Sequence, residues 1–233
     1  MAKITLYHGS ENIIQKPLFG FGNPKNDYGY GFYCTENIEL AKEWACTEEK
    51  DGFANEYSLD FRGLSVLNLS DSGYNILNWL AILVENRTFN VSSDIARDAK
   101  NFLRKNFLVP YLDYDVIKGY RADDSYFSFA NAFLTNTISL QKLNRAMYLG
   151  KLGEQVVIKS KKSFSKIKFV SSHPAERGVY YPKKMARDTA ARKTFFEMRA
   201  AEESYGAGAI YMVDIIRGGI KNGDPRIPAV LFG

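Results

Sequence analysis

Two predicted strands near the start of the chain, separated by a long loop, constrain its fold more than any other feature. Residues 3–7 and 32–35 have the composition of strands, and the segment between them contains the run Phe-Gly-Phe-Gly-Asn-Pro at residues 19–24. A loop of this length in a compact domain is usually functional. The end of the first predicted strand and the start of the second are therefore the first places to look for a site.

The residues at those two places are chemically distinctive. The first strand closes on Tyr7-His8-Gly9-Ser10, and glycines precede Tyr33 at the start of the second. Thr35 or Asn37 can cap a following helix in which Ile38, Ala41, Trp44 and Ala45 recur at helical spacing. This spacing predicts that Trp44 faces the body of the protein.

The remaining pattern mixes strands and helices, and it predicts an α+β fold. Further strands are expected at residues 56–61, 64–69, 113–119, 154–158 and 209–213, a turn at 121–124, and helices at 75–85, 93–106, 139–149 and 182–204. We interpret the chain as one domain over residues 1–233. It has a helical insertion at about 72–110 and a C-terminal helix-and-strand extension at about 171–233.

Composition excludes several classes of protein. With 233 residues, 45% of them hydrophobic, the chain can bury a sizeable core. It has no apolar run long enough to span a membrane, and its first residues do not resemble a secretory signal, so we expect a cytoplasmic protein with no membrane partner. Two cysteines, Cys34 and Cys46, and two histidines, His8 and His173, give no metal-site spacing, so no metal is expected.

Common catalytic motifs are missing. There is no phosphate-binding Gly-x-x-x-x-Gly-Lys-Ser/Thr loop, no Gly-x-Ser-x-Gly elbow, and Gly20-Phe21-Gly22 lacks the third glycine and the preceding strand of a dinucleotide fingerprint. Cys34 and His8 form a conceivable thiol nucleophile and base, but Cys34 lies in an apolar strand, where a packed cysteine is the simpler expectation.

The motifs that remain resemble those of a known superfamily. His8-Gly9-Ser10, Gly31-Phe32-Tyr33 and Trp44 are similar to the His-Gly-Ser, Gly-x-Tyr and stacking aromatic of the His-Tyr-Glu ADP-ribosyltransferases, the group that contains the poly-ADP-ribose polymerases and diphtheria toxin. A bacterial family of unknown function within that superfamily is more similar still. It shares motifs that stand here at residues 7–10, 27–35, 41–45, 122–124, 180–182 and 186–188.

The resemblance implies a split mixed β core with helical insertions, and NAD as a substrate. It implies that His8 bonds a ribose hydroxyl, that the Gly9 backbone, next to Ser10, holds the nicotinamide carboxamide, and that Tyr33 and Trp44 bracket the nicotinamide ring. Gln155 matches the third catalytic position, where most relatives carry a glutamate that stabilises the oxocarbenium-like charge. Adjacent side chains on a strand face opposite ways, so only one of Glu154 and Gln155 can point into the site. Gln155 is the expected residue, and Glu154 is the alternative.

Acidic and basic residues near the predicted cleft leave further roles open. Asp27, Asp123 and Asp124 are candidates to orient an acceptor or take its proton, or else ordinary turn residues. A net charge of +5 permits nucleic-acid contact without requiring it. The basic residues after Gln155 and along the predicted helix at 182–204 are typical either of an anion-steering surface or of a solvated face.

The resemblance therefore implies an NAD-dependent ADP-ribosyltransferase that modifies a protein or nucleic acid and releases nicotinamide. By resemblance to bacterial members, it would be a toxin, effector or phage-defence component, with an antitoxin or chaperone as a further partner. Two alternatives stay open: an NAD glycohydrolase, and a non-catalytic module that binds NAD or ADP-ribose, which the neutral side chain of Gln155 permits.

Overall fold

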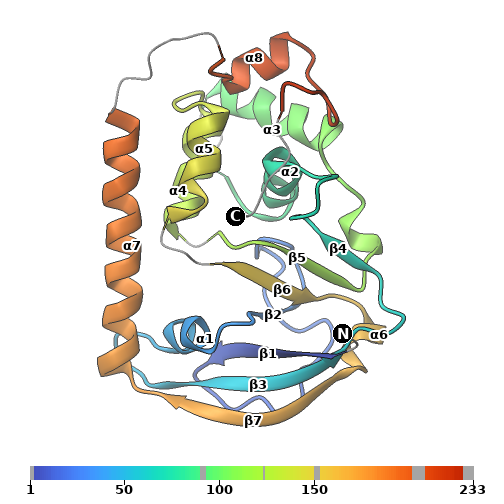
Figure 1. Cartoon of the computed structure of the whole chain (residues 1–233), viewed down its shortest axis with the longest axis vertical. Coiled ribbons are helices and arrows are strands. Elements are labelled where there is room, and N and C mark those ends of the chain that lie inside the picture. Colours follow the sequence, from blue (N-terminus) through green and yellow to red (C-terminus); the bar gives the residue numbers. More distant parts are fainter. Residues whose placement is uncertain (1–2, 90–92, 123, 150–152, 201–207, 228–233) are drawn as a thin grey trace.

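The computed structural model describes residues 3–89, 93–122, 124–149, 153–200 and 208–227. The fold is α+β, as the sequence predicts, and the strands in these ranges form two sheets (Figure 1). No helix in these ranges has the length and apolar character needed to cross a membrane.

The first sheet has three antiparallel strands in the order β1-β3-β7. These are β1 (Lys3–Ser10), β3 (Gly52–Asp60) and β7 (Ile167–Ala175). Strand β1 extends beyond the predicted 3–7 and so includes His8 and Gly9. Strand β7 was not expected, and it makes the segment at 171–175 part of a sheet, not the start of a C-terminal extension.

The second sheet has four strands in the order β2-β6-β5-β4. These are β2 (Phe32–Cys34), β6 (Glu154–Ile158), β5 (Val116–Tyr120) and β4 (Val66–Asn68), and only the β4–β5 pair is parallel. An isolated bridge between Tyr7 and Thr35 joins β1 to the end of β2. The two sheets therefore meet where His8 and Tyr33 lie.

The molecule is built in layers, because the strands of the second sheet are apolar on both faces. One face packs on the three-stranded sheet through a cluster that includes Leu6, Tyr57 and Val156. The other face, with Ile117 and Val157, packs under the helices. These helices are α2 (Ile76–Asn86), α3 (Asp94–Asn106), α4 (Asp124–Leu134), α5 (Leu140–Ala146) and α8 (Met212–Arg217) (Figure 1).

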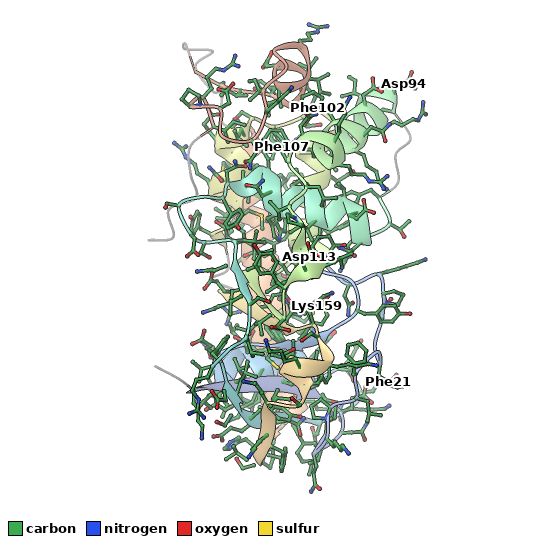
Figure 2. The ribbon with its side chains drawn as sticks, turned by 90° about the vertical axis from the view of Figure 1, so that its right-hand side faces the viewer. Phe21, Asp94, Phe102, Phe107, Asp113 and Lys159 are labelled. Carbon is green, nitrogen blue, oxygen red and sulfur yellow. The ribbon has the colours of Figure 1, made fainter. Side chains whose placement is uncertain are left out.

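Most predicted helices are present close to their expected bounds. Helix α1 (Ile38–Ala45) is capped by Asn37, and α2 and α3 are capped by Asn75 and Ser93. Short helical turns at η1 (Tyr111–Asp113) and α6 (Lys161–Phe164) flank β5 and β6 in the chain. Seen from the side in Figure 2, the loop that carries Phe21 stands away from this body, and Phe21 is 77% exposed.

Three predictions in the second half of the chain need correction. The strand expected at 209–213 is wrong, because Met212 and Val213 begin α8 and no strand includes residues 209–211. The long helix α7 (Arg177–Ala200) begins before Pro182, and the predicted end at residue 204 lies outside the described residues. Asp124, expected to end a turn at 121–124, instead begins helix α4, which was not predicted.

Candidate functional site

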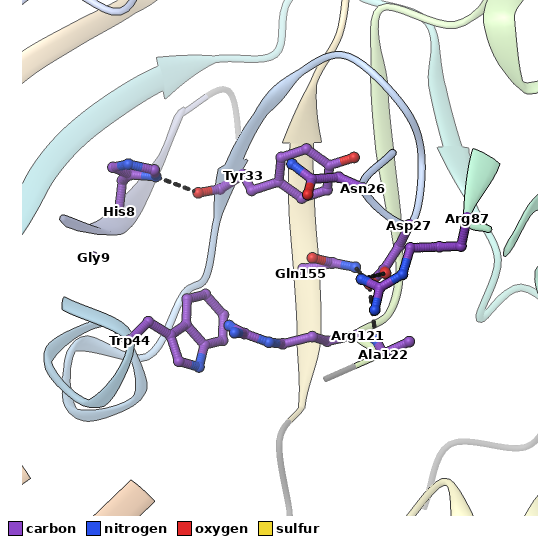
Figure 3. A pocket seen from close by; sticks show the side chains of 10 residues that line it. All are labelled: His8, Gly9, Asn26, Asp27, Tyr33, Trp44, Arg87, Arg121, Ala122 and Gln155. Atoms are coloured by element: carbon purple, nitrogen blue, oxygen red, sulfur yellow. Dashed lines mark hydrogen bonds and ion pairs between the residues drawn. The ribbon is translucent and has the colours of Figure 1, made fainter. Parts of the chain in front are cut away.

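One pocket gathers nearly all of the site residues that the sequence predicts (Figure 3). It lies where β1, β2 and β6 approach helix α1. It also includes Arg87, which directly follows α2, and Arg121 and Ala122, which directly follow β5. Its lining consists of His8, Gly9, Asn26, Asp27, Tyr33, Trp44, Arg87, Arg121, Ala122 and Gln155.

His8 lines this pocket with a ring whose tautomer is fixed by a hydrogen bond. Its Nδ1 lies 2.7 Å from the carbonyl oxygen of Tyr33, and a carbonyl can only accept, so Nδ1 carries the proton. Burial lowers the pKa of His8, which keeps the ring neutral near pH 7. A neutral ring protonated on Nδ1 has a free lone pair on Nε2. The ring is held in place by stacking on Phe32, with 4.3 Å between the centroids.

Gly9 allows helix α1 to pack directly on strand β1. A Cβ atom at this position would lie 2.1 Å from the carbonyl oxygen of Ala41 and 3.0 Å from the Cβ of Trp44. The glycine is therefore explained by the approach of the helix, a reason that differs from the expected approach of a ligand. This contact brings Trp44 to the pocket.

Tyr33 shapes the pocket through both its ring and its hydroxyl. The hydroxyl donates to the carbonyl of Gly29 at 2.6 Å and accepts from the amide of Tyr28 at 3.1 Å. Burial raises the pKa of Tyr33 far above its ordinary value, so the phenol stays neutral. Lys159 holds the same loop by donating to the carbonyls of Tyr28 and Tyr30. The loop beside the Tyr33 ring is thus anchored from β2 and from the residue that directly follows β6.

Trp44 is covered on one face by Arg121. The guanidinium carbon of Arg121 lies 3.6 Å from the centroid of the indole ring, which is a close cation–π contact. The resemblance implies that Trp44 stacks on a ligand ring, and in the structure the guanidinium of Arg121 lies on its ring (Figure 3).

Gln155 is buried, and its orientation is fixed by hydrogen bonds. The Nε2 atom donates to Oδ2 of Asp27 at 2.9 Å and to the carbonyl of Tyr120 at 3.0 Å. Both partners accept, so the amide nitrogen must face them, and the amide oxygen turns the other way, toward the pocket (Figure 3). Glu154 accepts from the hydroxyl of Ser70 and is not among the lining residues.

Asp27 lies at the centre of a network that the sequence only partly indicates. Besides Gln155, it accepts from the amide of Ala122 at 2.8 Å and from Arg87 at 3.1 Å. Burial raises the pKa of the carboxyl, while these donors oppose the change. Arg87, the residue that ends helix α2, was not predicted to belong to the site.

None of the other candidates among the described residues lines the pocket. The hydroxyl of Ser10 accepts from the amide of Asn12 and is not part of the pocket lining. Asp123 lies outside the described residues, and Asp124 begins α4. Cys34 is buried as a free thiol, and burial raises its pKa, so it is a packed residue and a poor nucleophile. Within the described ranges, no cluster of three or more His, Cys, Asp and Glu side chains suits a metal ion.

Several basic residues of α7 are paired with acids. Lys183 lies near Glu39, Arg187 binds Glu43 and Arg192 binds Asp188. These ion pairs favour the interpretation of this helix as a docked and solvated element over that of an open basic surface.

Comparisons with known proteins give a family and no activity. No curated protein and no solved structure matches the chain. A family model described as "Protein of unknown function (DUF3990)" matches residues 4–169, a range that includes every residue lining the pocket. The chain therefore belongs to the DUF3990 family of proteins of unknown function.

Proposed function

We propose that the protein is an NAD-dependent ADP-ribosyltransferase that acts on a macromolecular acceptor in the cytoplasm of a bacterium. The observation that carries this proposal is the convergence of His8, Tyr33, Trp44 and Gln155, which come from four separate elements, on one pocket. These are the positions at which the chain resembles the superfamily. Such convergence is what a shared ligand requires and what independent packing roles do not.

The polar groups of the pocket suit the parts of NAD. Nε2 of His8 and Oε1 of Gln155 are acceptors for ribose hydroxyls. Arg87 and Arg121 contribute two positive charges against the single carboxylate of Asp27, an excess that favours the anionic diphosphate. The ring of Tyr33 offers a flat wall beside which the nicotinamide can lie.

The reaction would separate charge at one carbon atom. The bond between C1′ of the ribose and the nicotinamide nitrogen breaks, and its electron pair leaves with the nicotinamide, which becomes neutral. The ribose is left with oxocarbenium character, and a nucleophilic atom of the acceptor bonds to C1′ and loses a proton. Groups that hold the ribose hydroxyls by accepting from them stabilise this positive charge as it develops.

A role as a toxin, effector or phage-defence component, controlled by an antitoxin or chaperone, is part of the proposal by resemblance alone.

A second candidate function is a module that binds NAD without cleaving it. It is favoured by one observation, the neutral amide of Gln155 where most relatives carry a carboxylate.

The test is incubation of the purified protein with labelled NAD and a bacterial lysate, followed by assays for free nicotinamide and for labelled macromolecules. We expect Gln155→Ala to lower nicotinamide release by about a hundredfold, because an acceptor for the developing charge is lost. Glu154→Gln is the matched control, since it changes the adjacent residue outside the pocket. Protease and nuclease digestion of the labelled product identifies the acceptor.

Other results would overturn the transferase proposal. Free ADP-ribose without labelled acceptor would identify a glycohydrolase. Binding of NAD in calorimetry without release of nicotinamide would identify a binding module.

A further inference from the structure

Gln155 stands at the position that the resemblance gives to the third catalytic residue. Its side chain is joined by a hydrogen bond to that of Asp27. The carboxylate and the amide lie 2.9 Å apart, and both residues are buried. They come from opposite ends of the matched family region, Asp27 from the loop before β2 and Gln155 from β6. The amide oxygen faces the pocket while the carboxylate stands behind the amide nitrogen (Figure 3).

We propose that Asp27 is a positioning residue that supplies, through Gln155, the negative charge that a glutamate at position 155 would supply directly. This inference rests on the proposed function. The two residues would form one unit, in which Gln155 touches the ribose hydroxyl and Asp27 fixes and polarises the amide. A neutral residue at position 155 would then be compatible with catalysis.

The hydrogen bonds of Asp27 favour its ionised form. Among the described residues, the amide of Ala122, the guanidinium of Arg87 and the amide of Gln155 bond its carboxylate, and all of them donate. A protonated carboxyl needs an acceptor for its own proton, and this set contains none. Burial raises the pKa of Asp27, and the three donors act against that rise.

The charge of Asp27 is transmitted by polarisation. A carboxylate that accepts from an amide N–H draws positive charge toward that end of the amide and increases the negative charge on its oxygen. The second N–H donates to the carbonyl of Tyr120, so the amide cannot rotate its oxygen away from the pocket. The oxygen is thereby a stronger and fixed acceptor for a hydroxyl next to a developing cation.

The other charged and titratable groups around the pair do not replace Asp27. Arg87 and Arg121 are cations, and burial keeps His8 and Tyr33 neutral. Of the residues that line the pocket, Asp27 alone carries a carboxylate.

A charge-swap cycle tests the proposal, with nicotinamide release as the readout. Asp27→Asn removes the charge, and we expect kcat to fall by about tenfold to a hundredfold. Asp27→Asn combined with Gln155→Glu exchanges the two groups, so that the asparagine amide donates to the new carboxylate. We expect the double variant to recover at least about tenfold over Asp27→Asn, because the charge has returned to the unit.

The comparison of these two variants isolates the charge. Both leave the amide of Ala122 without its carboxylate acceptor. The double variant also loses the donor to the carbonyl of Tyr120, a cost that acts against the expected recovery, so a recovery can be assigned to the returned charge. A double variant that is folded and no more active than Asp27→Asn would overturn the proposal. So would Asp27→Asn with the activity of the wild type.

Gln155→Glu alone gives a second, independent readout. It places two carboxylates at hydrogen-bond distance, and such a pair shares one proton. We expect its activity to fall as the pH rises through the second apparent pKa of the pair, a step that the wild type lacks. If Asp27→Asn does not fold, this profile decides, and a profile identical to that of the wild type overturns the proposal.

Nicotinamide release from the wild type distinguishes a failure of this proposal from a failure of the proposed function. Absence of nicotinamide release from the wild type and from the double variant would overturn the function itself, and with it the role of Asp27. Release from the wild type combined with any of the contrary results above would overturn only the role of Asp27.

Discussion

At the scale of single residues, the lowered pKa of His8 predicts how the stability of the protein depends on pH. Its pKa is lowered in the folded protein from an ordinary value of 6.5, so the unfolded chain takes up a proton first as the pH falls. The stability that the neutral ring contributes is therefore complete above pH 6.5 and is lost as the pH falls below it. We expect the urea-derived free energy of unfolding to drop more steeply below pH 6.5 in the wild type than in His8→Asn.

Asparagine is the matched replacement, since its amide can still donate to the carbonyl of Tyr33 but does not titrate in this range. The other histidine, His173, is present in both proteins and cancels in the comparison. Parallel pH profiles for the two proteins would contradict the lowered pKa of His8 in the folded protein.

Some residues of the site could be predicted from the sequence, and others could not. Tyr33, Trp44 and Gln155 stand in motifs at recognisable spacing, so they could be found before the structure. Arg87 and Arg121 could not, because their place in the pocket depends on where α2 ends and on the path of the chain after β5. Asp27 was found as a candidate acid, while its bond to Gln155 is a tertiary contact without a sequence pattern.

At the scale of elements, the packing of α1 on β1 depends on Gly9. An alanine Cβ there would overlap the backbone oxygen of Ala41, which cannot move without shifting the helix. We expect Gly9→Ala to destabilise the protein by about 1–3 kcal/mol, as over-packing usually does, and to weaken ligand binding by displacing Trp44. Gly178→Ala in α7 is the control, because the added Cβ has no neighbour within 4 Å outside the local backbone of its own helix. Urea unfolding that gives equal stabilities would contradict this account.

Elements were predicted well where a cap or an apolar period marks them, as in α1, α2 and α3. Strand β7 was missed because its second half, Ser-Ser-His-Pro, has low strand propensity, and it forms through pairing with β3. The apolar run at 209–213 is too short to distinguish strand from helix by period alone. Its backbone instead bonds helix α5, where the amide of Leu140 donates to the carbonyl of Ile210.

At the scale of the whole molecule, α7 connects the two sides of the pocket although it lies outside the residues matched by the family model. Near its middle, Arg187 makes a bidentate ion pair with the buried Glu43 of α1, the helix that carries Trp44. The next residue, Asp188, accepts from Ser125 of α4, close in the chain to Arg121. Farther along, Phe195 stacks on Phe129 of α4 with 4.0 Å between the ring centroids. Helix α7 therefore fixes the position of α1 relative to α4 (Figure 1).

The ion pair of Arg187 gives this arrangement a measurable consequence. Arg187→Met would leave Glu43 buried without that partner, and we expect a loss of about 3–5 kcal/mol in the free energy of unfolding. Lys183→Met, on the same helix, removes a half-exposed pair with Glu39 and should cost about 0–1 kcal/mol. Replacing both members of the buried pair, Glu43→Leu with Arg187→Met, should recover most of the loss, because no uncompensated charge then remains. Equal urea stabilities for Arg187→Met and Lys183→Met would show that α7 does not hold the pocket through this contact.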